Sequence, residues 1–99
     1  MKIVILRSAV RDLAGGYQFY ARQGEGLGEY FEESLLADIE SLRLYAGIHR
    51  KVHNFHRLLS KRFPYAVYYE VFEDQVRIRA VLDCRLDPTW TARRLKSKG

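Results

Sequence analysis

The sequence predicts an α+β domain: an N-terminal helical hairpin packed on a four-stranded, mainly antiparallel sheet, in the order β-α-α-β-β-β with a short C-terminal helix. Two observations support this prediction. In the first half, two successive segments repeat apolar residues every three or four positions, as the buried face of a helix does. In the second half, two runs rich in β-branched and aromatic residues flank Glu73-Asp74-Gln75, as in a β-hairpin. With 99 residues, the chain is expected to form a single domain over residues 1–99.

The first strand and the first helix are expected at the N-terminus. Residues 2–6 (KIVIL) are a nearly continuous apolar run, which is typical of a buried strand. Ser8 is a candidate N-cap for a helix that ends near Gln23-Gly24. Gly15-Gly16 is expected to weaken the middle of this helix, because glycine is a poor helix former. Its apolar face consists of Ala9, Leu13, Tyr17, Tyr20 and Ala21.

A second helix is expected over residues 27–46, after the turn Gly24-Glu25-Gly26. Gly47 is placed to end it as a C-cap residue. Because the turn is short, the two helices should form an antiparallel hairpin. The apolar face of the second helix consists of Leu27, Tyr30, Phe31, Leu35, Ile39, Leu42 and Tyr45 or Ala46.

The remaining strands are expected in the second half of the chain. Residues 48–52 (IHRKV) form a basic connector, and residues 54–59 (NFHRLL) form a strand. The hairpin follows, with strands over residues 65–72 and 76–82. A closing helix is expected over residues 87–95, with Asp87 or Thr89 as the cap and Pro88 in the first turn.

Several classes of protein are disfavoured by composition. The single cysteine, Cys84, excludes an internal disulfide, so a reducing compartment is expected. The N-terminal apolar run is too short for a secretory signal or for a spanning helix of about 20 apolar residues. We therefore expect a soluble, cytoplasmic protein that does not bind a membrane. We expect no cofactor and no metal site, because His49, His53 and His56 lack an accompanying cysteine or carboxylate cluster.

The positive charge is concentrated in one half of the chain. The formal net charge is +5. Residues 1–49 carry five Lys/Arg against seven Asp/Glu, whereas residues 50–99 carry twelve against five. The second half is therefore expected to face an anionic partner, either nucleic acid or an acidic protein. The alternative is that this charge serves solubility only.

The most specific part of a family resemblance lies in the second half of the chain. Residues 55–65 (FHRLLSKRFPY) lead into Tyr68-Tyr69-Glu70-Val71, and residues 80–88 (AVLDCRLDP) precede Trp90. With the β-α-α-β-β-β order, these segments resemble the RelE/ParE superfamily of toxins from bacterial toxin–antitoxin pairs, and the ParE side most closely. The resemblance covers nearly the whole chain.

The resemblance implies a toxin that stops growth when free and that a cognate antitoxin neutralises, often within a hetero-oligomer. ParE-like members bind DNA gyrase and block it, whereas RelE-like members cut ribosome-bound mRNA. We favour the ParE-like function, with the ribosome-dependent endoribonuclease as the alternative. A third option is a degenerate toxin that is retained as a partner-binding module.

The two main alternatives use overlapping sets of residues. Cleavage of RNA without a metal needs activation of a 2′-hydroxyl, stabilisation of charge on the phosphate, and protonation of the leaving oxygen. The candidates for this chemistry are His56, Arg57, Lys61, Arg62, Arg79 and Arg85. The expected contacts of a ParE-like toxin are Arg57, Arg62, Arg79, Arg85, Trp90, Arg93 and Arg94.

The pattern departs from that of RelE-like enzymes at three places. Ala66 stands where those enzymes tend to carry an arginine, and Leu59 is apolar where a second base is wanted. Residues 87–99 contain no tyrosine or histidine. These departures favour the binding function over the enzymatic one.

Individual residues also have purely structural interpretations. Arg77 and Arg79 have equal claims to an anion contact and to the solvent side of an amphipathic strand. Trp90 is expected to plug the gap between the final helix and the sheet, and Cys84 to be a buried small hydrophobe. His56 is a candidate general base, although a satisfied surface histidine is the more common case. Tyr65 and Tyr69 should share one face of their strand, opposite Tyr68.

Overall fold

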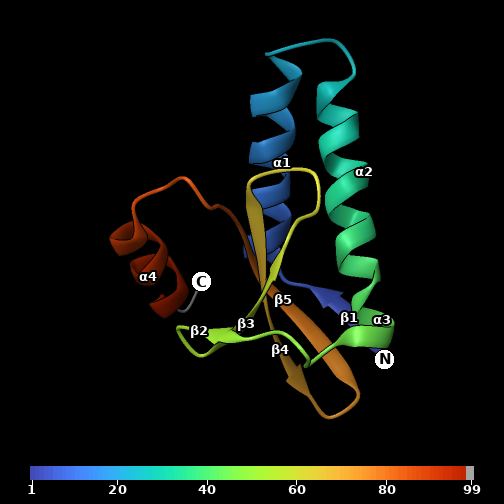
Figure 1. Cartoon of the computed structure of the whole chain (residues 1–99), viewed down its shortest axis with the longest axis vertical. Coiled ribbons are helices and arrows are strands. Elements are labelled where there is room, and N and C mark those ends of the chain that lie inside the picture. Colours follow the sequence, from blue (N-terminus) through green and yellow to red (C-terminus); the bar gives the residue numbers. More distant parts are fainter. Residues whose placement is uncertain (98–99) are drawn as a thin grey trace.

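The computed structural model describes residues 1–97 and confirms the α+β class (Figure 1). Within these residues the sheet has five strands, one more than predicted. The elements are β1 (Lys2–Ile5), α1 (Arg7–Ala21), α2 (Leu27–Glu40), α3 (Leu42–Tyr45), β2 (Lys51–Val52), β3 (Phe55–Leu59), β4 (Tyr65–Phe72), β5 (Gln75–Asp83) and α4 (Pro88–Lys96).

The additional strand is β2, which the sequence predicts as part of a connector. It pairs with β3 through Lys51 opposite His56 and Val52 opposite Phe55. The turn between them is His53-Asn54, where φ is 53° and 70°. Positive φ at both central residues is what a tight two-residue hairpin requires. The sequence does not signal this hairpin, because His53-Asn54 contains no glycine and is not one of the favoured pairs such as Asn-Gly or Asp-Gly.

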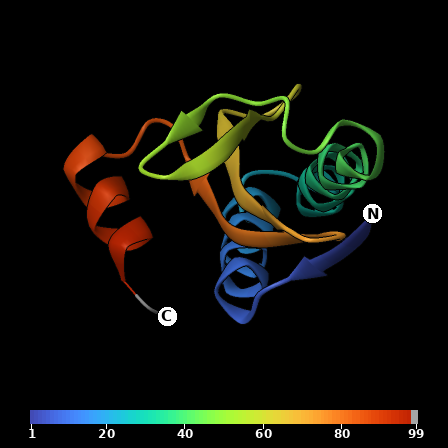
Figure 2. The ribbon, with the colours of Figure 1, turned by 90° about the horizontal axis from the view of Figure 1, so that it is seen from below.

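The sheet is mainly antiparallel, as predicted. Its strand order is β1-β5-β4-β3-β2, with β1 parallel to β5 and the other pairs antiparallel. The register between β4 and β5 shifts at Tyr68/Tyr69, because Arg79 is an extra residue on β5. Such a bulge strengthens the local twist. One face of the sheet packs against the helical hairpin, and the other lies toward α4 (Figure 2).

The helical hairpin forms as predicted, with two local differences. The helix expected over residues 27–46 is divided at Ser41, whose hydroxyl donates to the Asp38 carbonyl oxygen at 2.6 Å. This bond competes with regular helical bonding and tightens the turn. Gly47 has φ of 93° directly after Ala46, so the predicted stop is confirmed.

The main core lies between the helical hairpin and the sheet. Tyr65 and Tyr69 both point into it, whereas Tyr68 faces the opposite side, as predicted. The buried side chains of this core are Ala9, Leu13, Tyr20, Phe31, Leu35, Ile39, Leu42, Tyr65, Val67, Tyr69, Val76, Ile78 and Val81.

A smaller core lies on the other face of the sheet, beneath α4. Leu95 of α4 packs there with residues of β4 and β5, and Val52 and Phe55 flank them. The predicted start of α4 is confirmed, because the Asp87 side chain accepts a bond from the Thr89 N–H at 2.8 Å. Trp90 is not the predicted plug, since 45% of it is exposed and Leu95 takes that place.

Ser8 does not cap α1, contrary to the prediction. The helix begins two residues earlier than this cap implies, at Arg7, and the N-cap residue is Leu6, which has no capping side chain. The Ser8 hydroxyl instead donates to the carbonyl oxygen of Arg79 at 2.8 Å. The bond gives the Arg79 carbonyl oxygen a donor just past Ile78, where β1 stops pairing with β5. None of the helices described is both long and apolar enough to cross a bilayer.

Candidate functional site

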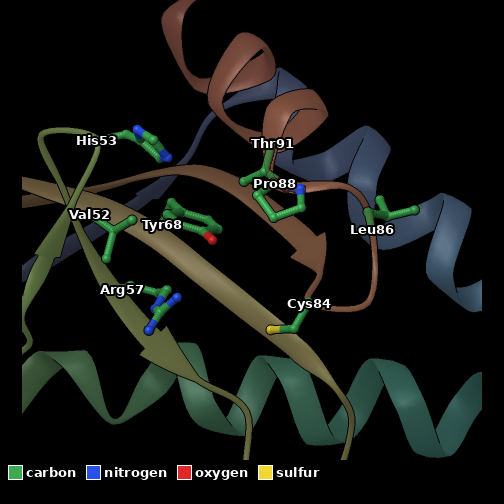
Figure 3. A pocket seen from close by; sticks show the side chains of 8 residues that line it. All are labelled: Val52, His53, Arg57, Tyr68, Cys84, Leu86, Pro88 and Thr91. Carbon is green, nitrogen blue, oxygen red and sulfur yellow. The ribbon is translucent and has the colours of Figure 1, made fainter.

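A cavity of about 150 Å³ opens on the α4 side of the sheet (Figure 3). It lies between the β2–β3 hairpin and the segment that joins β5 to α4. Its lining residues are Val52, His53, Arg57, Tyr68, Cys84, Leu86, Pro88 and Thr91. The cavity therefore combines one guanidinium with a phenol, an imidazole and several apolar groups.

Arg57 is the cationic group of this cavity. It stands on β3 directly opposite Tyr68 of β4, and both side chains line the cavity. Burial raises the pKa of Tyr68, while a hydrogen bond with Arg57 opposes that rise. At neutral pH the phenol keeps its proton, so the pair offers a positive charge and a hydroxyl to an incoming anion.

Cys84 is exposed rather than buried, so the expectation of a buried small hydrophobe was wrong. The reason is local, because β5 ends at Asp83 and Cys84 already belongs to the turn. Its thiol lines the cavity, and partial burial raises its pKa despite the nearby guanidinium of Arg57. The thiol is therefore protonated at neutral pH.

Arg85 does not line this cavity. Its guanidinium donates to both carboxylate oxygens of Asp83, at 2.9 and 2.8 Å, and to the Tyr20 hydroxyl at 3.4 Å. These hydrogen bonds lower the pKa of the Asp83 carboxyl. The contact with Tyr20 of α1 turns Arg85 toward the helical hairpin and away from Arg57.

Arg79 does not lie on the solvent side of its strand, so one of the two interpretations of this residue is wrong. It is only 8% exposed, and its guanidinium donates to the Ser8 hydroxyl and to the Ser97 carbonyl oxygen. The end of α4 covers it, because the C-terminal helix returns over this part of β5. Arg77 is half-buried, with its guanidinium 4.8 Å from the centre of the Phe72 ring.

The other predicted contact residues lie in separate places. Lys61 and Arg62 are exposed in the turn between β3 and β4, and Trp90 and Arg93 are exposed on α4. Arg94 forms an ion pair of 2.9 Å with Asp12 of α1 and is mostly buried. The structure therefore does not bring Arg57, Arg79 and Arg85 to one basic concavity.

His56 and Arg57 lie on opposite faces of the sheet, although they are adjacent in sequence. The His56 ring stacks on Tyr69 in the main core, with ring centres 5.0 Å apart. Its Nδ1 donates to the His49 carbonyl oxygen at 2.6 Å. His56 is thus held in a structural contact, and it cannot act on a group bound at Arg57.

Tyr69 joins these histidines to the end of the helical hairpin. Its hydroxyl accepts the Gly47 N–H at 3.0 Å and lies in hydrogen-bond contact with Nδ1 of His49. Burial, followed by the charge of His56, lowers the pKa of His49 from its ordinary value of 6.5. His49 is therefore neutral in the folded protein near neutral pH.

This lowered pKa makes stability depend on pH. The unfolded chain binds a proton at His49 more readily than the folded chain, so the free energy of unfolding should fall as the pH drops below 6.5. In a His49→Gln variant, the slope over this window should be smaller. Urea unfolding followed by circular dichroism measures both slopes, and equal slopes would contradict the assignment.

The structure offers no metal centre in the part of the chain it describes. Among residues 1–97 there is no group of three or more His, Cys, Asp or Glu side chains that could hold a metal ion.

Comparisons with known proteins identify the fold. No protein-family model matches the sequence, and no curated protein matches it either. A solved chain described as "Chromosomal ParDE TA system from P. aeruginosa" is similar, with a TM-score of 0.75 and 21% sequence identity. The match covers 82% of this chain and 92% of that chain. The chain therefore has the fold of a protein from a ParDE toxin–antitoxin system, as its resemblance to the RelE/ParE superfamily implies.

Proposed function

We propose that the chain is the toxin of a type II toxin–antitoxin pair, that it acts by binding DNA gyrase, and that a cognate antitoxin neutralises it. The observation that carries this proposal is the structural match to a ParDE chain over 82% of this chain. The ParE-like segments that end in Asp87-Pro88 and Trp90 support it independently.

The surface around the cavity has the composition of a protein-binding site. Three large apolar side chains of this region are exposed: Leu86 (43%), which lines the cavity, Leu59 (55%), two residues after Arg57 on β3, and Trp90 (45%) on α4. Aromatic and arginine side chains contribute most to binding at protein interfaces. We propose this surface as the contact with the target or with the antitoxin. The exposed Arg62 and Arg93 stay proposed contacts, although they lie outside the lining of the cavity.

A second candidate function is the ribosome-dependent endoribonuclease. One observation favours it, because the cavity gathers Arg57, His53 and Tyr68, which could hold a phosphate and move a proton. The cavity contains a single arginine, however, and Arg85 is held by Asp83. Binding without catalysis is therefore the better-supported function.

Controlled expression of the free protein tests the proposal. Pulse-labelling should show DNA synthesis failing before protein synthesis, because gyrase inhibition stops replication first. Protein synthesis failing first, together with mRNA cleavage on programmed ribosomes, would establish the ribonuclease instead. If neither process stops, the chain is not an active toxin. Co-expression of the antitoxin encoded by a neighbouring gene should restore growth.

Replacing Arg57 by alanine tests the proposed surface. Removing one charge-assisted contact should weaken target binding about tenfold and allow growth at expression levels that arrest the wild type. Arg43→Ala is the matched control, because Arg43 is an exposed arginine paired with Glu40 on the helical hairpin. Equal toxicity of all three proteins would remove Arg57 from the contact surface.

A further inference from the structure

A second depression, of about 540 Å³, lies at the N-terminus of α1 and is separate from the cavity around Arg57. Its lining residues are Leu6, Arg7, Ser8, Arg11, Phe55, Glu70 and Arg79. They come from the start of α1, from Leu6 directly before it, and from three strands of the sheet. The last turn of α4 lies beside this place, because Arg94 donates to the Ser8 carbonyl oxygen at 3.3 Å.

Three arginines converge on this depression. Arg7 and Arg11 are exposed and lie one turn apart on α1, so their side chains share a face of the helix. Arg79 lines the depression from β5, and only 8% of this residue is exposed. The carboxylate in the lining is Glu70, which stands opposite Arg77 on the neighbouring strand.

Within residues 1–97, the buried guanidinium of Arg79 forms no ion pair. Its hydrogen-bond acceptors in this part of the chain, the Ser8 hydroxyl and the Ser97 carbonyl oxygen, are both neutral. The ion pairs among residues 1–97 involve Arg43, Arg85 and Arg94 instead. Asp12 lies near enough for Arg79 to affect its pKa, but that carboxylate already accepts bonds from Arg94 and from the Val81 N–H. A buried guanidinium normally has an anionic partner.

The start of α1 adds further positive potential. The helix has no capping side chain, no acidic residue in its first turn, and fifteen residues whose peptide dipoles align. The first N–H groups of a helix have no partner within it, so they are available to an anion. Ser8 cannot serve as their cap, since its hydroxyl is bound to Arg79.

We propose that this depression binds the phosphate group of a nucleotide or nucleic acid. Arg7 and Arg11 would hold the phosphate oxygens against the start of α1, and Arg79 would supply a fixed charge behind them. Planar guanidinium groups suit phosphate because they donate two parallel bonds. The Phe55 ring in the same lining offers a face on which the attached base can stack. This inference does not depend on the proposed toxin activity.

Titration of the purified chain tests the proposal. The probes are inorganic phosphate, adenosine 5′-monophosphate, adenosine and a short single-stranded DNA, followed by amide chemical shifts and by fluorescence anisotropy. Saturable shifts at residues 7–11 are expected with phosphate-bearing probes and not with adenosine. Similar affinity for the nucleotide and the DNA would identify a single-phosphate ligand, whereas salt-dependent preference for DNA would identify nucleic acid.

Charge-matched variants distinguish binding at this site from nonspecific attraction of phosphate to a positively charged protein. Arg7→Gln should weaken binding about tenfold, and Arg7→Gln with Arg11→Gln about a hundredfold. Arg43→Gln with Arg50→Gln removes the same charge elsewhere and should leave affinity within about twofold. All four positions are exposed, so the variants should fold. Absence of saturable binding by every probe, or equal loss in both double variants, would overturn the proposal.

Discussion

Replacing Gly16 by alanine should lower the free energy of unfolding by about 1–3 kcal/mol, whereas the same change at Gly15 should raise it by about 0.5–1 kcal/mol. Both residues lie in α1 and differ only in what a methyl group would meet. A Cβ built at Gly16 would lie 2.4 Å from Cζ and 2.5 Å from Cε2 of Phe31. A Cβ at Gly15 would meet nothing within 4 Å.

The clash at Gly16 cannot be relieved by a small movement of Phe31. That ring is fully buried and packs against Tyr20, Phe63 and Tyr65, with ring centres 5.2, 5.2 and 4.8 Å away. A new methyl must therefore push α1 and α2 apart or displace several aromatic rings. Overpacking of this kind strains a close-packed core.

Urea unfolding of the two single variants measures the difference. A double-mutant cycle with Phe31→Leu identifies its cause, since leucine lacks the ring atoms that the methyl would meet. In that background, Gly16→Ala should cost less than about 1 kcal/mol. If Gly16→Ala costs the same with Phe31 and with Leu at position 31, the close approach of the ring is not the reason.

The same glycine pair illustrates what local sequence patterns predict. The spacing of apolar residues predicted both helices of the hairpin, although the second is divided at Ser41, and the alternation of tyrosines predicted the correct faces of β4. Helix propensity alone predicts that both glycines of Gly15-Gly16 destabilise the helix, and it predicts no stabilising role for either. The benefit at Gly16 comes from Phe31, which is distant in sequence and close only in the folded chain.

The candidate sites were less predictable for a related reason. Alternation along β5 placed Arg79 correctly on one face, but nothing local indicated that α4 would return and cover it. Arg7 and Arg11 were overlooked because they belong to the half of the chain with a negative balance. Their spacing of four at the start of a helix without an acidic first turn was the available signal.

Replacing Asp12 by alanine should lower the free energy of unfolding by about 3 kcal/mol. The reason is the edge of the sheet. β1 pairs with β5 only as far as Ile78, so the next part of β5 pairs with β4 on one side and has no neighbouring strand on the other. Asp12 takes over there, because its carboxylate accepts the Val81 N–H at 3.0 Å and binds Arg94 at 2.9 Å. Alanine leaves both donors without this acceptor.

Asp12→Asn is the matched variant, and it should lose less than half as much stability as Asp12→Ala. Asparagine keeps an oxygen for the Val81 N–H but removes the charge. Burial, more than any other influence, raises the pKa of Asp12 above its ordinary value of 3.8, although Val81 and Arg94 oppose this. Burying the charged carboxylate therefore costs free energy. The neutral amide of asparagine avoids this cost and can still accept the hydrogen bond from the Val81 N–H.

The raised pKa of Asp12 predicts how the difference in stability between the wild type and Asp12→Asn changes with pH. The folded chain holds the Asp12 proton more tightly than the unfolded chain, so this contribution to stability falls as the pH rises from 3.8 through the raised pKa. Asp12→Asn lacks this titration, so the wild type should lose stability relative to it over that window. Thermal and urea unfolding across the window measure the difference. A wild type that gains stability there relative to Asp12→Asn would mean that the ion pair with Arg94, and not the hydrogen bond to β5, governs the role of Asp12.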